Sequence, residues 1–327
     1  MRILITGANG YIGSRLVHLL QGRHTVRGLV RATSNLKLLQ GAQLELAHGD
    51  VTDPASVAAA VSGMDLVIHT AGAVMDWGKL DEFTKINVDG TRHLAQAAEK
   101  AGVQRLVHIS TVAVHGFDFQ YATEEHPMPP SPVAYCETKK LAEQWLKEFA
   151  QTSRMEIVMV RPGNVFGPYD EKFIQPYLDF IKKGGFLYVN GGRGLTCPSY
   201  IENLVHGIEL ACFQENIHGE SFILTDGLEI NWRQFTSAFV EQLGLPQPKR
   251  SLPWGLVHGV AYGMESVYKL LGKREAPLLT RYRINNAGKD YHFSIEKARR
   301  LLGYQPPVDF ETSVSRTIAW YRNQHPV

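Results

Sequence analysis

Short apolar runs alternate with amphipathic helical patterns through the first half of the chain. Most of these runs are continuous rather than alternating in polarity, which is typical of strands buried on both faces of a parallel sheet. The predicted strands span residues 2–6, 25–30, 44–47, 66–70, 105–110 and 156–160. The predicted helices span residues 12–21, 54–61, 81–100 and 134–150. These repeated β-α units predict an α/β fold with a doubly wound parallel sheet and right-handed crossovers.

This alternation ends near Pro168. Glycine pairs follow at residues 184–185 and 191–192, then one strand candidate at residues 221–225 and a mostly helical pattern. We therefore predict two domains. Residues 1–168 form the domain built on the sheet, and residues 200–225 return to it. Residues 169–327 form a smaller, mainly helical domain that binds the substrate.

Composition narrows the class of protein. The chain has 327 residues, of which 44% are hydrophobic and 20% charged, so it can bury a sizeable core and is neither disordered nor fibrous. Its net charge of +2 gives no basic field for nucleic acid. The three cysteines, Cys136, Cys197 and Cys212, form no CxxC pair, and the scattered histidines predict no metal site. We expect a soluble protein in the reducing cytoplasm.

The sequence predicts neither a signal peptide nor a membrane-spanning helix. Gly7 follows the first apolar run too early for a signal peptide. Residues 254–272 are apolar but include Glu265 and Lys269, so they fall short of the about 18 uninterrupted apolar residues of a spanning helix. This segment would wall a hydrophobic pocket, touch a membrane surface peripherally, or form a core helix. Its larger apolar side chains are Trp254, Val257, Tyr262, Met264, Val267 and Tyr268.

Three glycines follow the first predicted strand and lead into a helix. In the spacing Gly-x-x-Gly-x-x-Gly, Gly7 allows a tight turn, Gly10 lets the backbone approach a pyrophosphate, and Gly13 lets the helix pack closely on the strand. The helix N-terminus then offers free amides and a partial positive charge to phosphates. An ordinary strand–turn–helix would also tolerate glycines, but the position between strand and helix favours a Rossmann-type dinucleotide site.

The end of the second strand bears on the choice of cofactor. NAD sites usually place an acidic residue there, whereas an arginine suits the 2′-phosphate of NADP. Here Arg31 follows the strand, with Thr33 and Ser34 as further donors, so we favour NADP over NAD. A solvated arginine is the alternative. Asp50, after the third strand, either accepts a hydrogen bond from the adenine or serves as a turn residue.

Tyr135 and Lys139 are four residues apart, so they share one face of a predicted helix. An ammonium beside a phenol favours the phenolate and should lower the pKa of Tyr135 from about 10. Such a phenol could donate and accept a proton for an alcohol–carbonyl pair. Tyr-x-x-x-Lys alone is common on amphipathic helices. The strand at residues 105–110 strengthens the prediction, because it leads to hydroxyls at the carboxyl edge of the sheet.

Together these segments resemble the extended short-chain dehydrogenase/reductases over nearly the whole chain. The matching segments are TGANGYIG at 6–13, GDVTD at 49–53, DLVIHTAG at 65–72, NVDGT at 87–91, HISTVAVHG at 108–116, YCETK at 135–139 and RPGNVFGP at 161–168. The resemblance implies that Tyr135 is the acid/base, that Lys139 binds the nicotinamide ribose, and that Thr111, or its neighbour Ser110, holds the substrate oxygen. It also implies that Asn87 is structural and that similar enzymes form homodimers through helices 81–100 and 134–150.

The resemblance likewise implies a set of cofactor-binding residues. They are Gly7, Asn9, Gly10, Tyr11, Ile12, Gly13, Arg31, Asp50, Val51, Thr70, Ala71, Gly72, Tyr135, Lys139, Pro162, Asn164 and Val165. In the second proposed dimer helix, Leu141, Ala142, Trp145, Leu146 and Phe149 form an apolar stripe. A stripe that faces the core would have the same spacing.

Residues other than Tyr135 and Lys139 indicate which branch of this family the chain resembles. Sugar-nucleotide dehydratases place an acidic pair after the catalytic threonine, where this chain has Val112-Ala113. Sugar-nucleotide epimerases use an Arg-Asp pair where this chain has Thr196-Cys197. Loss of that arginine removes a diphosphate contact worth about 1.5–3 kcal/mol. Arg193 or the arginines of residues 281–283 could replace it. The segment IENLVHG at 201–207 instead resembles the 3β-hydroxysteroid dehydrogenase branch, and Val30-Arg31 resembles dihydroflavonol-reductase-like enzymes.

We therefore predict an NAD(P)-dependent oxidoreductase that interconverts a secondary alcohol and a ketone on a hydrophobic substrate, such as a steroid, a flavonoid or a long-chain 3-keto compound. The alternative is a sugar-nucleotide epimerase with tightly bound NAD. A non-enzymatic dinucleotide sensor is a third hypothesis, which the presence of the Tyr-Lys pair disfavours.

Overall fold

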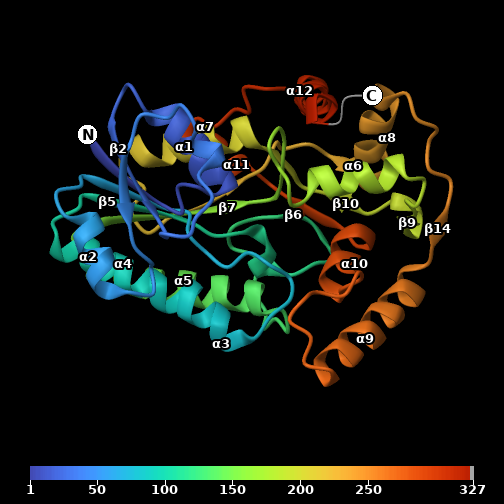
Figure 1. The fold of residues 1–327 in the computed structure, drawn as a ribbon, viewed down its shortest axis with the longest axis horizontal. Helices are drawn as coiled ribbons and strands as arrows, with labels where there is room; N and C mark the ends of the chain where they lie inside the picture. Colours follow the sequence, from blue (N-terminus) through green and yellow to red (C-terminus); the bar gives the residue numbers. More distant parts are fainter. Residues whose placement is uncertain (325–327) are drawn as a thin grey trace.

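The computed structural model describes residues 1–324. Its centre is a parallel sheet with helices packed around it (Figure 1). The seven strands of this sheet have the order β12-β7-β5-β4-β1-β2-β3. Strand β1 lies between β2 and β4, so the direction of strand addition reverses beside β1. Open α/β sheets bind ligands at such a switch point, beyond the carboxyl ends of the strands. The predicted Rossmann-type fold with a helical C-terminal region is confirmed.

The strands are β1 Arg2–Thr6, β2 Thr25–Val30, β3 Glu45–His48, β4 Leu66–His69, β5 Arg105–Ile109, β6 Phe119–Ala122, β7 Glu156–Pro162, β8 Asn164–Phe166, β9 Tyr188–Val189, β10 Leu195–Thr196, β11 Pro198–Tyr200, β12 Ser221–Leu224, β13 Ile230–Asn231, β14 Ser251–Leu252 and β15 Tyr291–Phe293. The α-helices are α1 Tyr11–Leu20, α2 Pro54–Val61, α3 Leu80–Phe83, α4 Gly90–Lys100, α5 Ala134–Ala150, α6 Ile174–Lys182, α7 Ile201–Phe213, α8 Trp232–Leu243, α9 Trp254–Leu270, α10 Arg281–Gly288, α11 Glu296–Leu302 and α12 Phe310–Gln324. Short turns of other helix types are η1 Lys37–Leu39, η2 Thr84–Asp89, η3 Val112–His115 and η4 Asn190–Gly192.

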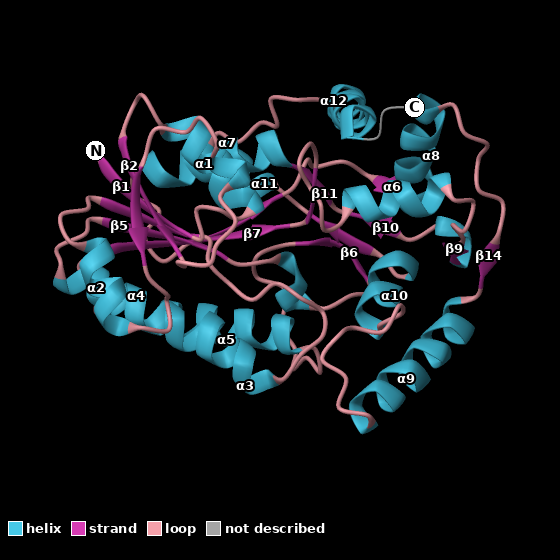
Figure 2. Cartoon of the chain, in the orientation of Figure 1, coloured by secondary structure: helices cyan, strands magenta, loops and turns pink. Residues whose placement is uncertain are grey.

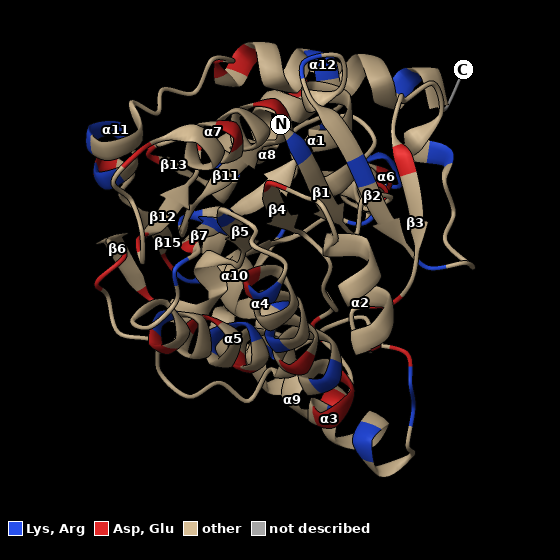
Figure 3. Cartoon of the chain, turned by 90° about the vertical axis from the view of Figure 1, so that its left-hand side faces the viewer, with Lys and Arg blue, Asp and Glu red and all other residues tan. Residues whose placement is uncertain are grey.

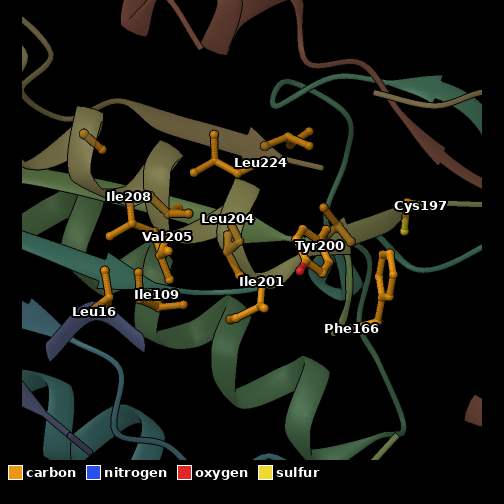
Figure 4. Packing of buried hydrophobic residues seen from close by; sticks show 14 of the residues in the cluster. Leu16, Ile109, Phe166, Cys197, Tyr200, Ile201, Leu204, Val205, Ile208 and Leu224 are labelled. Carbon is orange, nitrogen blue, oxygen red and sulfur yellow. The ribbon is translucent and has the colours of Figure 1, made fainter. Parts of the chain in front are cut away.

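Hydrophobic cores lie on both faces of the sheet. In β1, Ile3 and Ile5 belong to one core, and Leu4 between them belongs to the other. Successive side chains of a strand point to opposite faces, so a strand covered on both sides must be apolar throughout. This explains the continuous apolar runs of the sequence. Figure 4 shows part of the first core, where Ile201, Leu204 and neighbouring α7 side chains pack beside Leu224 of β12.

The helices form a layer on each side of the sheet. Helices α1, α7 and α11 cover one face, and α2, α4 and α5 cover the other (Figure 2). Lys and Arg are interspersed with Asp and Glu over these helices and loops, as expected for a net charge of +2 (Figure 3). No helix within residues 1–324 is long and apolar enough to cross a membrane.

Most predicted elements of the first half match the structure within one or two residues. The main difference is at residues 81–100, where the sequence predicts one helix. The structure has α3, then the π-helical segment η2, then α4. A π-helical turn inserts an extra residue and re-aims the side chains around it. Here it carries Asn87, whose contacts are described below.

The second half contains short strands that the hydrophobic pattern does not reveal. Strand β12 joins the main sheet beside β7, and β6 pairs with β15 while β8 pairs with β11. Strands that precede residue 168 therefore pair with strands that follow it. The division into domains at that residue remains a proposal.

A buried ion pair fastens α5 to the sheet. Glu143 of α5 and Arg161 of β7 have fully buried side chains, and Arg161 Nη2 donates to Glu143 Oε2 over 2.6 Å. Arg161 Nη1 also donates to the carbonyl of Glu124 over 2.9 Å. Burial alone would raise the pKa of Glu143, but the charge and hydrogen bonds of Arg161 outweigh it and lower that pKa. The carboxylate is thus ionised and satisfied inside the protein.

Substituting Arg161→Met should destabilise the fold, because Glu143 would remain buried without its counter-charge. We expect the free energy of unfolding in urea to fall by about 3–5 kcal/mol. The double variant Glu143→Leu with Arg161→Met should recover much of that loss. A single variant as stable as the wild type would show that the pair contributes nothing.

Candidate active site

The glycine segment forms a tight turn between β1 and α1. Gly7 has φ +65° and its carbonyl accepts a 2.8 Å hydrogen bond from the N–H of Gly10. A Cβ on Gly13 would lie 2.3 Å from the same carbonyl oxygen, so the helix can approach the strand this closely only with glycine there. A Cβ on Gly7 would lie 2.8 Å from Cα of Ala71 at the end of β4. The turn is therefore compressed between two strands.

This turn fits the pyrophosphate of a dinucleotide. Gly10, the residue before α1, is exposed and has no side chain to cover the first-turn amides. The first helical hydrogen bond comes from Ser14, whose N–H donates to the carbonyl of Gly10. The N–H groups of Tyr11, Ile12 and Gly13 thus remain for an anion at the positive end of the helix.

The adjoining segment after β4 is held by hydrogen bonds. Thr70 Oγ1 donates to the carbonyl of Thr6 over 2.6 Å, and the N–H of Ala71 donates to Thr6 Oγ1 over 3.2 Å. Asn87 Oδ1 accepts from the N–H of Ala73, and a Cβ on Gly72 would lie 3.2 Å from that oxygen.

Asn87 also links this segment to α5. Its Nδ2 donates to the carbonyl of Ala73 and to Thr138 Oγ1, at 3.2 and 3.0 Å. Thr138 is next to Lys139, so the amide of Asn87 fixes the active-site helix against the end of β4. These contacts agree with the structural role expected for Asn87.

Lys139 is buried on the face of α5 opposite the end of β5, and Tyr135, one turn before it on the same face, is half-buried. Lys139 Nζ donates to the carbonyl of Ile109 over 2.5 Å and lies 3.2 Å from Nε2 of His108. Burial lowers the pKa of Lys139 to about 8. Burial, followed by the charge of Lys139, lowers the pKa of His108 well below its usual value. His108 is thus neutral and able to accept from the ammonium.

The structure does not bear out the predicted effect of Lys139, which was to lower the pKa of Tyr135. Burial raises the pKa of Tyr135 above its usual value, and a hydrogen bond with Thr111 offsets this only in part. The prediction of a lowered pKa was wrong for the chain by itself. Sequence spacing places the two residues on one face but does not reveal how fully that face is buried, and desolvation dominates here.

The two candidate hydroxyls have different surroundings. Thr111 interacts with Tyr135, and its Oγ1 accepts from the N–H of Ala113 over 3.1 Å. Ser110 is buried, and its Oγ has no hydrogen-bond partner among the described residues. Thr111 is therefore the hydroxyl that meets the phenol.

Four of the other predicted cofactor residues lie in the loops that follow the first three strands. Arg31 is exposed after β2, and its N–H donates to Ser34 Oγ. Asn9 Nδ2 donates to the carbonyl of Asn35 over 3.3 Å. Asp50 Oδ1 accepts from the N–H and the hydroxyl of Thr52, so the turn role considered for it is present. Val51, after it, is buried.

The segment after β7 closes the opposite side of the site. Pro162 is buried at the end of β7, and Val165 lies in β8. Asn164 exchanges two amide hydrogen bonds with Asn286 of α10, at 2.9 and 3.1 Å. Asn164 Nδ2 also donates to Thr196 Oγ1 over 3.1 Å. This polar cluster ties the segment to the C-terminal helices.

A cavity of about 310 Å³ adjoins the Tyr135–Thr111 pair. Its wall includes Ala113, Ala134 and Cys136, the sequence neighbours of that pair, and residues of α9 and α10. Trp77, Phe117 and Tyr282 supply aromatic surface. Burial raises the pKa of the Cys136 thiol to about 12, so this cysteine is an inert wall residue.

Two carboxylates of the cavity wall form ion pairs with arginines. Glu265 pairs with Arg281 over 2.7 Å, and Asp76 pairs with Arg283 over 2.8 Å. The sequence pattern did not predict these ion pairs, because the two residues of each pair are far apart in the chain. It also missed Glu143, which a simple signal could have found, since it continues the four-residue spacing of Tyr135 and Lys139.

Comparison with known proteins identifies the family of the chain. Residues 3–222 match the NAD dependent epimerase/dehydratase family. The chain belongs to this family. The match confirms the predicted resemblance, and with the names of its relatives it confirms the prediction of an NAD(P)-dependent dehydrogenase/reductase.

Two relatives and one solved structure illustrate the likeness. The 4-hydroxy-2-methyl-3-oxo-4-farnesyl-3,4-dihydroquinoline-1-oxide ketoreductase of Stigmatella aurantiaca is 32% identical over 309 residues, 93% of this chain and 92% of the relative. The 3 beta-hydroxysteroid dehydrogenase/Delta 5-->4-isomerase of Mycobacterium tuberculosis is 31% identical over 336 residues, 98% and 90% of the two chains. The dTDP-glucose 4,6-dehydratase DesIV of Streptomyces venezuelae, solved with NAD and TYD bound, superposes with a TM-score of 0.79 at 27% identity, covering 99% of this chain and 97% of that one.

Substituting Gly10→Ala should weaken dinucleotide binding, because its Cβ would stand 3.1 Å from the Gly7 carbonyl in the exposed cradle. We expect the Kd for NADP, measured by isothermal titration, to rise by about tenfold, equivalent to about 1.4 kcal/mol. Gly255→Ala in α9 is the control, since a Cβ there meets no atom within 4 Å. Equal affinities of the two variants would place the pyrophosphate elsewhere.

Proposed function

We propose that the chain is an NADP-dependent reductase or dehydrogenase that interconverts a hydrophobic ketone and its secondary alcohol. The observation that carries this proposal is the position of Tyr135 beside Thr111, because their chain neighbours Ala113, Ala134 and Cys136 line a cavity with aromatic walls. The family relationship supports the choice of a nicotinamide cofactor.

In this proposal Tyr135 and Thr111 both hydrogen bond to the substrate oxygen. Nicotinamide, when bound, supplies or accepts the hydride. Because burial raises the pKa of Tyr135, the phenol stays protonated near neutral pH and suits donation of its proton to a ketone oxygen. Lys139, held by the carbonyl of Ile109, orients its ammonium toward the same site and would bind the ribose.

A hydrophobic substrate is supported by the cavity and by the relatives. The cavity volume of about 310 Å³ lies at the small end of the roughly 300–1,000 Å³ typical of ligand pockets. The carboxylates of Glu265 and Asp76 in its wall are neutralised by Arg281 and Arg283, so no charge on the substrate is required to balance them. Names of the two relatives refer to a steroid and a farnesylated quinoline. We place the substrate in this class of large, mainly apolar ketones.

The sugar-nucleotide alternative lacks a free arginine for the diphosphate among the candidates from the sequence. Arg281 and Arg283 are paired with carboxylates, and Arg193 Nε donates to the carbonyl of Asn190. Thr196 and Cys197, which occupy the Arg-Asp position, are buried. Arg281 or Arg283 could bind a diphosphate only if its ion pair opened, and Arg193 would have to give up its bond to a backbone carbonyl, which disfavours an epimerase.

The proposal also includes NADP as the cofactor, a cytoplasmic location and a homodimer. Arg31 is exposed beside the glycine turn and favours the 2′-phosphate of NADP over NAD. All three cysteines are buried and free, which suits a reducing cytoplasm. A homodimer through α4 and α5 would use Leu141, Trp145 and Phe149, which are exposed or half-buried, whereas Ala142 and Leu146 face the core.

The substitution Tyr135→Phe should abolish most turnover while leaving the fold intact. Loss of a positioned proton donor typically costs about 10²–10⁴-fold, so we expect kcat with a 3-keto steroid to fall within that range. Tyr262→Phe, on the exposed side of α9, is the matched control. Full activity in the Tyr135 variant would reject this acid/base assignment.

Changing Arg31→Ala tests the cofactor preference. Removing the guanidinium should weaken NADP(H) by about tenfold or more, through loss of a charge-assisted contact worth about 1.5–3 kcal/mol, and leave NAD(H) nearly unchanged. Fluorescence titration with NADPH and NADH measures both affinities. Equal losses for the two cofactors would contradict recognition of the 2′-phosphate.

A further inference from the structure

Helix α9 carries apolar residues on both its inner and its outer faces. Val257, Ala261 and Glu265 are buried at four-residue spacing and form the inner face. The outer face contains Leu256, Val260, Val267 and Leu270, which are 57%, 47%, 52% and 87% exposed. A surface helix normally turns polar residues to water, so an apolar outer face indicates a further contact.

The exposed apolar surface continues beyond the helix. Leu271 and Leu278, in the segment that links α9 to α10, are 62% and 73% exposed. A second segment lies against this end of α9, because Trp77 Nε1 donates to the carbonyl of Lys273 and its ring meets that of Tyr268 edge-on. That same loop carries exposed Val74 and Met75. We call Leu256, Val260, Val267, Leu270, Leu271 and Leu278 the α9 surface.

Basic residues border the α9 surface at the C-terminal end of the helix. Lys269, Lys273 and Arg274 are exposed there, with Glu275 as the acidic residue beside them. Lys269 Nζ lies 5.9 Å from the centre of the Trp77 ring, which keeps the ammonium beside an aromatic side chain. Exposed aliphatic residues with an adjoining excess of positive charge are typical of a helix that lies in the headgroup region of an anionic bilayer.

We propose that the α9 surface is a peripheral docking site for a lipid bilayer that contains anionic phospholipids. In the structure α9 lies at the edge of the molecule beside α10, where a flat partner could reach it (Figure 1). A second copy of the chain fits less well. An antiparallel pair of α9 helices would place the basic end against residues 254–264, which contain no acidic residue. A parallel pair would place Lys269, Lys273 and Arg274 against the same residues of the other copy.

The inner face of the same helix borders the cavity. His258, Glu265 and Lys269 line it, so a protein docked through α9 holds the cavity next to the bilayer. An apolar ketone could then pass from the lipid to Tyr135 with little exposure to water. This consequence rests on the proposed function, but the docking itself does not.

The test is co-sedimentation of the full chain with sucrose-loaded vesicles. One set contains phosphatidylcholine alone, and the other contains phosphatidylcholine with an equal amount of phosphatidylglycerol. We expect the protein to sediment mainly with the anionic vesicles and to be released by high salt. The triple variant Val260→Ser, Val267→Ser and Leu270→Ser should lose at least about tenfold in partitioning, as should Lys273→Glu with Arg274→Glu.

Controls separate docking from folding and from self-association. Leu46→Ser with Phe180→Ser removes exposed apolar side chains elsewhere and should leave sedimentation unchanged. Circular dichroism checks that every variant is folded. Docking is overturned if the wild type stays in the supernatant with both vesicle types, or if the triple serine variant sediments equally well. A mass by light scattering that halves in the triple variant, without vesicle binding, would assign the surface to a second copy instead.

Turnover of a water-soluble ketone without vesicles is measured in parallel. Sedimentation without any turnover would refute the proposed function and leave the docking site standing. Turnover without sedimentation would do the reverse.

Discussion

The buried face of α5 is the constraint on which the site depends. Tyr135, Lys139 and Glu143 follow one another at four-residue spacing along it, and each has a separate partner at the end of a strand. These partners are the hydroxyl of Thr111, the carbonyl of Ile109 and the guanidinium of Arg161. The Glu143–Arg161 pair fixes the helix to β7, so the first two residues are held in register with the end of β5.

Burial of this face also sets its electrostatics. The pKa of Tyr135 is raised and that of Lys139 is lowered, both chiefly by desolvation. A neutral phenol beside Thr111 is the form that can donate a proton to a ketone. The cavity next to it is bounded by α9 and α10, where Glu265 pairs with Arg281 and Arg283 pairs with Asp76. In the proposed mechanism the sheet domain contributes the proton donor, and the C-terminal helices contribute a wall in which Arg281 and Arg283 are both paired.

The sequence predicted the features that depend on local spacing. Continuous apolar runs located the strands of the main sheet, and the glycine spacing located the turn after β1. It did not predict contacts between distant segments, such as Arg161 with Glu143 or His108 with Lys139, because pattern along the chain does not reveal which segments meet. Two-residue strands such as β9 and β14 are too short to show a period. The pKa of Tyr135 was misjudged because its direction depends on burial by the whole fold.

An isotope label distinguishes net hydride transfer to a hydrophobic ketone from the turnover of an epimerase. The purified chain is incubated with NADPH deuterated at nicotinamide C4 and a 3-keto steroid or long-chain 3-keto ester. We expect the product alcohol to carry the deuterium, seen by mass spectrometry, as the absorbance of NADPH falls. Turnover of a UDP-sugar with no net change in that absorbance, and no label in any ketone-derived alcohol, would contradict it.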